Sequence, residues 1–133
     1  MLPNRDEGFA RPHGRETAMP TISEHNEVYT VIVVFTVAPE HQRALVEAIV
    51  PEVERWVRHC AGFISSSFHL SNDGTRVVNY AQWTTKEAWQ AFTRSPEQAV
   101  LGERIKNAGK GASPDAHGYS VYRVLENSDD AQR

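Results

Sequence analysis

Ten consecutive residues, from Val28 to Val37, limit the possible fold more than any other stretch of this chain. They read VYTVIVVFTV, a run that is almost entirely β-branched or aromatic. Residues of this kind favour strands, and a strand with so few polar positions is covered on both of its faces. The run therefore predicts a central strand in a sheet that is packed on both sides.

The residues before this strand have a different character. Residues 1–26 mix prolines, glycines and charged side chains with almost no apolar periodicity, so they cannot bury enough surface to become ordered alone. We predict a flexible N-terminal tail over residues 1–26, one domain over residues 27–126 and a short C-terminal tail over residues 127–133. Two questions stay open: whether the first tail becomes ordered on a partner subunit, and whether Met19 is the original start.

Charge and cysteine content restrict the partners. The chain has 14 Lys and Arg against 17 Asp and Glu, a net charge of -3, so we expect no binding to nucleic acid or to anionic membranes. The single cysteine, Cys60, excludes an internal disulfide, and no cluster of histidine and cysteine has metal-ligand spacing. No apolar run approaches the roughly 20 residues that span a bilayer. We expect a soluble, cytoplasmic protein that binds a small molecule and no metal.

A long helix is predicted after the first strand. Pro39 occupies a position that a first helical turn tolerates, and apolar residues then recur at helical spacing up to Cys60. Pro51 lies inside this pattern, where it removes one backbone hydrogen bond. The sequence therefore predicts a helix from Pro39 to about Cys60 that kinks or breaks near residues 47–50.

A β-hairpin is predicted after Gly62, which ends the helical region. Its strands cover Phe63–Leu70 and Thr75–Trp83, and the turn signal Asn72-Asp73-Gly74 joins them. A turn this short makes the two strands antiparallel neighbours in the sheet.

The register of this hairpin follows from the alternate apolar residues of its strands. Burying the more apolar set of each strand on one face places Phe68 near Asn79 and turns His69 to the opposite face. A three-residue turn would reverse this and bring His69 to the buried side. The buried set is Ile64, Phe68 and Leu70 with Val77, Ala81 and Trp83, and the residues that share the face of His69 are Tyr80 and Gln82.

The remaining elements complete an α+β pattern. The sequence predicts a helix from a Thr84 and Glu87 capping box to about Thr93, a helix from the Ser95-Pro96 cap to about Asn107, a loop over Ala108–His117 and a last strand over Gly118–Leu125. The order strand, helix, strand, strand, helix, strand is typical of the ferredoxin-like split βαβ fold. In that fold, helices cover one face of an antiparallel sheet.

The second face of the sheet predicts a partner subunit. The side chains assigned to it are too apolar for solvent, so we expect the sheet of a second copy to cover them in a homodimer. These residues are Tyr29, Val31, Val33, Val78 and Tyr80, or their neighbours.

The third strand carries two polar groups in an apolar setting. Alternate residues of a strand share a face, so Asn79 and Trp83 lie together among apolar neighbours. An unpartnered buried amide costs on the order of 1 to 3 kcal/mol, so the pair is either a satisfied part of the core or the polar floor of a pocket. In a pocket, the amide and the indole N–H would suit a developing oxyanion on an aromatic ligand.

Other catalytic patterns are missing from the sequence. It contains no nucleotide-binding glycine motif, no Ser-His-Asp arrangement and no carboxylate pair at a constrained spacing. His69 is interpreted either as a structural or surface histidine or as a general base. The aromatic residues Trp56, Phe63, Phe68, Trp83, Trp89 and Phe92 would, in the simplest interpretation, form a core between sheet and helices.

The segment FHLSNDGTRVVNYAQW and the helix that carries Trp89 resemble one known family. From Phe35 to about Pro96, the chain is similar to the antibiotic biosynthesis monooxygenases, which are small dimeric α+β barrels. It resembles most the members that need no cofactor and that oxidise anthrones or phenols of polyketide type to quinones with O2. The resemblance implies that Asn79 and Trp83 are catalytic and donate hydrogen bonds to a substrate oxyanion and then to a peroxide.

The same resemblance implies a set of substrate-binding residues: Phe68, Trp89, Phe92 and Arg104. Phe68 and Trp89 stand where the quinone-forming members carry tyrosines. Arg104 is interpreted either as a basic residue at the pocket or as a solvated helix charge.

Two alternative functions stay open. One is a non-catalytic dimer that binds an aromatic polyketide intermediate in the same pocket. The other is haem degradation, which the same family contains. The ligand histidine of the haem-degrading members would align near Gly102 and their first-strand asparagine near Val33, and neither side chain is present here.

Overall fold

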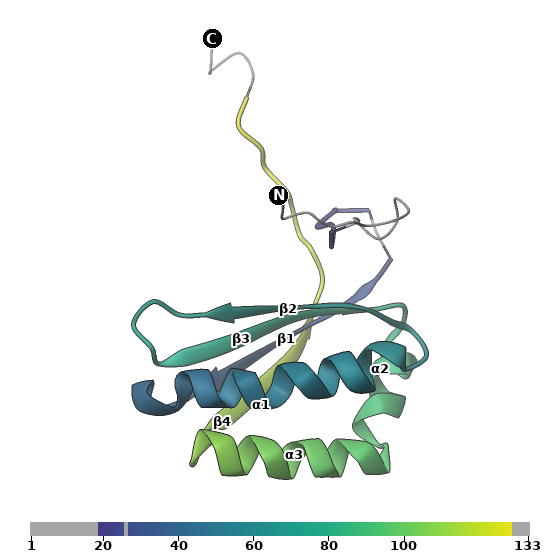
Figure 1. The fold of residues 1–133 in the computed structure, drawn as a ribbon. Helices are drawn as coiled ribbons and strands as arrows, with labels where there is room; N and C mark the ends of the chain where they lie inside the picture. The colour runs from purple at the N-terminus through teal and green to yellow at the C-terminus, as the bar shows by residue number, and fades with distance from the viewer. Residues whose placement is uncertain (1–18, 26, 129–133) are drawn as a thin grey trace, which may run out of the picture.

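The computed structural model describes residues 19–25 and 27–128, so most of the predicted tails lie outside the described residues. Four antiparallel strands form one sheet in the order β2-β3-β1-β4, and three α-helices lie on one face of it (Figure 1). This arrangement confirms the predicted α+β ferredoxin-like fold. The elements are β1 (Tyr29–Thr36), η2 (Pro39–His41), α1 (Gln42–Arg55), η3 (Val57–His59), β2 (Phe63–Leu70), β3 (Arg76–Trp83), α2 (Lys86–Thr93), α3 (Pro96–Gly109) and β4 (Ser113–Tyr119), where η marks a 3-10 turn.

Strand β1 lies at the centre of the sheet, as its apolar run predicts. It pairs with β3 along one edge and with β4 along the other, so Val33 has Asn79 on one side and Ala116 on the other. Val31 and Phe35 point toward the helices and are 1% and 6% exposed. They join apolar side chains of α1 and α3 in two core clusters. The strand therefore connects the sheet to the helical layer along its whole length.

Helix α1 passes through Pro51 without a break. The face of this helix that turns to the sheet buries Leu45 and Ile49, which are 0% and 4% exposed. Burial contributes about 2 kcal/mol for each such side chain, and two of them outweigh the cost of about 3 kcal/mol of an interior proline. Of the two predicted outcomes near residues 47–50, a kink or a break, the break is therefore wrong. The helix also ends earlier than predicted, at Arg55, and η3 follows as a separate turn.

The β2–β3 hairpin has the predicted register over most of its length. Phe68 lies opposite Asn79, on the face that turns to the helices. His69 lies opposite Val78 on the other face and is exposed, as predicted. The sequence was sufficient here because a shift of one residue would have moved every apolar side chain of the strand to the wrong face.

One end of this hairpin differs from the prediction. The register shifts between Phe63 and Ser65, so Phe63 rather than Ile64 lies opposite Trp83. Ile64 is 41% exposed, and its predicted burial is wrong. A bulge adds one residue to one strand, and alternation alone cannot predict where this happens.

The hairpin turn is built around Asp73. Its Oδ1 accepts hydrogen bonds from the Thr75 hydroxyl at 2.7 Å, the Ser71 hydroxyl at 2.8 Å and the Thr75 backbone N–H at 3.0 Å. These bonds, those of Thr75 first, lower the pKa of the Asp73 carboxyl from 3.8 to about 2. Gly74 follows with φ of 83°, a left-handed conformation that favours glycine. The turn signal read from the sequence is therefore a hydrogen-bonded turn.

Helix α2 begins one residue later than predicted. The hydroxyl of Thr85, not that of Thr84, accepts the backbone N–H of Ala88 at 3.0 Å and caps the helix. Thr84 is held at the end of the hairpin, because its backbone N–H donates to the carbonyl of Gly62 at 2.7 Å. The predicted capping box with Glu87 is therefore wrong, although the helix and its end at Thr93 are as expected.

Helix α3 begins at the predicted cap. The hydroxyl of Ser95 accepts the backbone N–H of Gln98 at 3.3 Å. The helix continues two residues beyond the predicted end at Asn107 and closes at Lys110, whose φ of 50° is left-handed. In the described part of the chain, no helix is long and apolar enough to cross a membrane.

The last strand lies earlier in the chain than predicted. Strand β4 falls mostly in the segment expected to be a loop, Ala108–His117, and residues 120–128 have no regular secondary structure. The SPDAHGY sequence of β4 contains few strand-favouring residues, but its backbone pairs along the free edge of β1. Pro114 is tolerated because an edge strand has one row of N–H groups without a partner strand. The predicted loop is therefore wrong, and of the predicted strand over Gly118–Leu125 only Gly118 and Tyr119 belong to β4.

The sheet face away from the helices carries an apolar patch, which we call the outer patch and define as Ile32, Val34, Val78 and Tyr80. The pairing places Ile32 opposite Tyr80 and Val34 opposite Val78, and all four side chains are half-buried in the single chain. Val78 and Tyr80 thus lie on the face predicted for them. Tyr29, Val31 and Val33 instead turn to the helices, because they share the phase of Asn79, and their neighbours take the predicted place.

The described part of the N-terminal segment contacts the domain. The side-chain amide of Gln82 donates to the carbonyl oxygen of Thr21 at 2.9 Å. The carboxylate of Glu24 accepts the backbone N–H of Val124 at 2.8 Å. Residues 19–25 are therefore tied both to β3 and to the segment that follows β4.

The Asp73 turn generates a pH-dependent prediction. The ionised carboxylate stabilises the fold above its unfolded pKa of 3.8, and this contribution is lost as the pH falls from about 4 toward the folded pKa of about 2. We expect Asp73→Asn to lower the melting temperature at pH 7, because a neutral amide accepts weaker hydrogen bonds. Thermal melts across the acid range should show the difference from wild type closing between pH 4 and pH 2. A difference that stays constant over that range would contradict this account.

Candidate active site

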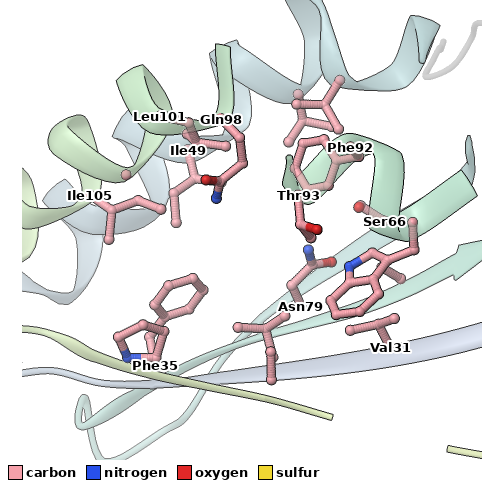
Figure 2. Close-up of a pocket in the computed structure, with 18 of the residues that line it drawn as sticks. Val31, Phe35, Ile49, Ser66, Asn79, Phe92, Thr93, Gln98, Leu101 and Ile105 are labelled. Atoms are coloured by element: carbon pink, nitrogen blue, oxygen red, sulfur yellow. The ribbon is translucent and has the colours of Figure 1, made fainter. Parts of the chain in front are cut away.

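A cavity of about 630 Å³ lies between the sheet and the three helices (Figure 2). All four strands and all three α-helices contribute to its lining, which is mostly apolar or aromatic. Cavities of this size and character hold small organic ligands. The polar side chains in the lining, besides the indole groups of Trp83 and Trp89, are Ser66, Asn79, Thr93, Gln98, Glu103 and Lys106.

Asn79 lies in the floor of this cavity. It comes from the middle of β3, between Val33 of β1 and Phe68 of β2. Its side-chain Oδ1 is fully buried and has no hydrogen-bond partner among the described residues. Buried polar atoms are nearly always paired, and an unpaired one costs about 1 to 3 kcal/mol. Within the described chain, Asn79 is therefore not a satisfied core amide.

Trp83 lies on the same face of β3 as Asn79, two residues beyond Ala81. It is 2% exposed and fixed by two rings: Phe63 meets it edge-on at 5.3 Å between centroids, and Phe92 stacks on it at 5.3 Å. Its indole N–H makes no hydrogen bond to any described residue. The contacts define the orientation of the ring, so this donor has a fixed position in the cavity wall.

The structure brings five of the six predicted catalytic and substrate-binding residues to one cavity. Asn79, Trp83, Phe68, Trp89 and Phe92 all line it. The hairpin register places Phe68 beside Asn79, and α2 supplies the other two aromatic residues from above the sheet.

Arg104 is placed differently. It does not line the cavity, and its Nε lies 3.5 Å from the Oε2 atom of Glu52. Glu52 is 6% exposed, and its carboxylate also accepts the Trp56 indole N–H at 3.0 Å and pairs with Arg55. The guanidinium of Arg104 thus links α3 to a buried carboxylate of α1. Glu103, its neighbour on α3, lines the cavity instead.

Five polar residues of the lining were not found from the sequence: Ser66, Thr93, Gln98, Glu103 and Lys106. Figure 2 shows Thr93 pointing from α2 toward Asn79, which points up from the sheet, and Gln98 pointing from α3 into the cavity to one side of Asn79. A signal for Gln98 was present, because it lies three and seven residues before the apolar Leu101 and Ile105 and so shares their helix face. Ser66 has the phase of Phe68, but the prediction considered only the apolar members of that set.

The sequence profile of the antibiotic biosynthesis monooxygenases matches residues 28–104, which include β1, the hairpin and much of α3. The chain belongs to the antibiotic biosynthesis monooxygenase family. The predicted resemblance is thereby confirmed.

Individual relatives within the antibiotic biosynthesis monooxygenases agree with this assignment. The tetracenomycin-F1 monooxygenase of Streptomyces glaucescens is 46% identical over 78 residues, 59% of this chain and 70% of that protein. The fold also matches the crystal structure of a monooxygenase from the gene ActVA-Orf6 of Streptomyces coelicolor, in complex with the ligand nanaomycin D. The two sequences are 35% identical, and the TM-score is 0.68. The match covers 76% of this chain and 93% of the monooxygenase chain. The cofactor-independent oxygenase SnoaB of Streptomyces nogalater shares the fold, with 16% identity, a TM-score of 0.60 and coverage of 77% and 100%.

The two positions expected to carry haem-binding side chains in haem-degrading members of the family are Val33 and Gly102 in this chain. Val33 and Gly102 both line the cavity, and neither has a side chain that could bind iron. The lining contains no histidine or cysteine. Across residues 19–25 and 27–128, no group of three or more His, Cys, Asp and Glu side chains could hold a metal ion. The donor set of this cavity therefore does not fit a haem iron.

The unpaired amide of Asn79 generates a stability prediction. We expect Asn79→Leu to raise the free energy of unfolding by about 1 to 3 kcal/mol, because it removes an unsatisfied buried acceptor and the cavity has room for the larger side chain. Urea denaturation would measure this. As a matched control, Asn107→Leu on the exposed surface of α3 should change the free energy by less than about 0.5 kcal/mol. A loss of stability in Asn79→Leu would show that the amide is satisfied after all.

Proposed function

We propose that this chain is a cofactor-independent monooxygenase that uses O2 to oxidise an aromatic polyketide-type phenol or anthrone to a quinone. Membership of the antibiotic biosynthesis monooxygenases and 46% identity to the tetracenomycin-F1 monooxygenase support the reaction class. The observation that carries the proposal is the unpaired amide oxygen of Asn79, beside Trp83 in an aromatic cavity of about 630 Å³. The single domain over residues 27–126 would be the functional unit.

The proposed reaction needs no flavin or metal because the substrate itself supplies the electrons. Ground-state O2 is a triplet, so it reacts readily only with a partner that can give up one electron. An anthrone that has lost a ring proton is such a partner. Electron transfer and recombination form a carbon–oxygen bond, and protonation gives a hydroperoxide. Loss of water from the hydroperoxide leaves the new carbonyl, so one CH2 group and one O2 give one C=O group and one H2O.

Asn79 and Trp83 have complementary roles in this scheme. Removal of the proton places negative charge on the substrate oxygen, and the amide and indole N–H groups can donate hydrogen bonds to it. In an apolar cavity such donors stabilise charge more than they would in water. The same donors then face the peroxide. The Oδ1 atom of Asn79 is buried without a partner in the described chain, so a substrate hydroxyl could donate to it while the Nδ2–H group donates to the oxyanion.

The aromatic walls hold the ring system and exclude water. Phe68, Trp89 and Phe92 line the cavity, and their rings could stack on a planar fused-ring substrate. The side chains of Glu103 and Lys106, 69% and 75% exposed, mark where the cavity meets solvent. The substrate proton would leave to water on that side. Arg104 contributes indirectly in this proposal, because its ion pair with Glu52 fixes α3 over the sheet.

The proposed assembly is a homodimer formed through the outer patch. Four apolar side chains in register on one sheet face are more than a solvated face normally presents together, and the sheet of a second copy would cover them. The cytoplasmic location predicted from the sequence stays a prediction.

An oxygen-consumption assay tests the proposed reaction. The purified protein, given an anthrone in air, should consume O2 and form quinone absorbance faster than heat-inactivated protein does. We expect Asn79→Ala and Trp83→Phe each to lower kcat about a hundredfold, the typical loss for one donor to an oxyanion. His69→Ala should keep the wild-type rate, because this side chain points away from the cavity.

The outcomes of this assay separate the alternatives. Wild-type protein that binds the anthrone without consuming O2 would support the non-catalytic binding function. Loss of the rate in His69→Ala would restore that histidine as a base. If the double variant of Asn79 and Trp83 oxidises the anthrone as fast as wild type, the proposed catalytic residues are wrong.

A second experiment tests the dimer. Light scattering or sedimentation should give wild-type protein twice the mass of one chain, and Val78→Glu should shift it to the monomer because it places a charge in the outer patch. The matched control is Val100→Glu on α3, where the side chain is 54% exposed and the added charge should leave the mass unchanged. Monomeric wild-type protein at micromolar concentration would contradict the proposed assembly.

A further inference from the structure

The roof of the cavity contains a free amide that the proposed reaction does not use. Gln98 lies in the first turn of α3, where the Ser95 cap fixes its backbone. Its side chain is half-buried, lines the cavity and makes no hydrogen bond to any described residue. The amide can both donate and accept, and Figure 2 shows it directed from the roof toward the interior.

The neighbouring polar groups are less available than this amide. The hydroxyl hydrogen of Thr93 is already donated to the carbonyl oxygen of Gln90 at 2.8 Å, which leaves Thr93 only as an acceptor. Glu103 and Lys106 pair with each other at 4.0 Å at the exposed end of the cavity. Among the polar residues of the roof, Gln98 therefore has the greatest remaining hydrogen-bonding capacity.

The wall next to Gln98 lacks a side chain. Gly102 follows Gln98 by one helical turn and lines the cavity on the same face of α3. A Cβ atom at Gly102 would meet nothing within 4 Å, so close packing does not require glycine there. Glycine in the interior of a helix lowers stability relative to alanine. The space that it leaves open lies beside the free amide.

From these two observations we propose that Gln98 and Gly102 form a subsite for an oxygen-bearing substituent on the substrate. Gln98 hydrogen-bonds a hydroxyl or carbonyl group on a ring distant from the reacting carbon, and Gly102 provides the room for it. The substrate class is thereby narrowed to fused-ring compounds with oxygen functions at both ends. This inference rests on the proposed function, whose oxyanion contacts lie at Asn79 in the floor.

Paired substrates test the subsite. The probes are a trihydroxyanthrone and the matching dihydroxyanthrone that lacks the outer-ring hydroxyl. Wild-type protein should have a kcat/KM about tenfold higher for the first, since a site built to bind a hydroxyl discriminates against an analogue without it. Gln98→Leu should remove this tenfold preference and leave kcat/KM for the dihydroxyanthrone within about twofold of wild type.

Two further variants separate specificity from a loss of structure. Gly102→Leu should reduce kcat/KM for the trihydroxyanthrone about tenfold while the melting temperature stays equal or rises, because leucine favours the helix. Gln90→Leu is the matched control, since Gln90 is a half-buried glutamine of α2 that does not line the cavity. It should keep the preference.

A binding measurement distinguishes failure of this inference from failure of the proposed function. Quenching of tryptophan fluorescence by the two corresponding anthraquinones requires no turnover, and the hydroxylated one should bind about tenfold more tightly to wild type than to Gln98→Leu. If neither anthrone is oxidised but this difference is found, the proposed function fails and the subsite stands. Equal losses for both probes in Gln98→Leu, or an unchanged preference, would overturn the subsite.

Discussion

Strand β1 hydrogen-bonds to a neighbour along each of its edges, and the position of every other layer follows from this double pairing. The phase of β1 directs Val31 and Phe35 to the helices, and its pairing with β3 places Asn79 opposite Val33. The other phase, with Ile32 and Val34, creates the outer patch. One strand thus determines both the floor of the cavity and the face that we propose for dimerisation. Its β-branched composition suits a strand that is covered on both sides.

The features that the sequence predicted are those with a strong local or periodic signal. The β1 run, the Ser95 cap and the hairpin register, with Phe68 beside Asn79, were found because a different arrangement would expose apolar side chains or lose a cap. Strand β4 was misplaced because its pairing with β1 depends on backbone contacts and not on its residue types. The bulge near Ile64 and the ion pair of Arg104 with Glu52 depend on tertiary contacts that no local pattern contains. For the same reason the sequence left open whether Asn79 was a core amide or part of a pocket.

Two buried polar groups of this domain differ in their hydrogen-bond and ion-pair partners. The carboxylate of Glu52 has three partners, from Arg55, Trp56 and Arg104, so its burial is compensated and it connects α1 to α3. The amide oxygen of Asn79 has none among the described residues. The satisfied group lies between helices, whereas the unsatisfied one faces the cavity. This division is expected where stability and ligand binding place different demands on polar atoms.

The length of the Asp73 turn decides which side chains of β2 face the cavity. The turn lies on the surface, yet together with the bulge it fixes which phase of β2 faces the helices. A one-residue insertion or deletion there would exchange the two phases of the strand. An imidazole, from His69, would then stand beside Asn79 in place of the phenyl ring of Phe68. A length change in an exposed turn could in this way give the same scaffold a proton acceptor without any substitution in the cavity itself.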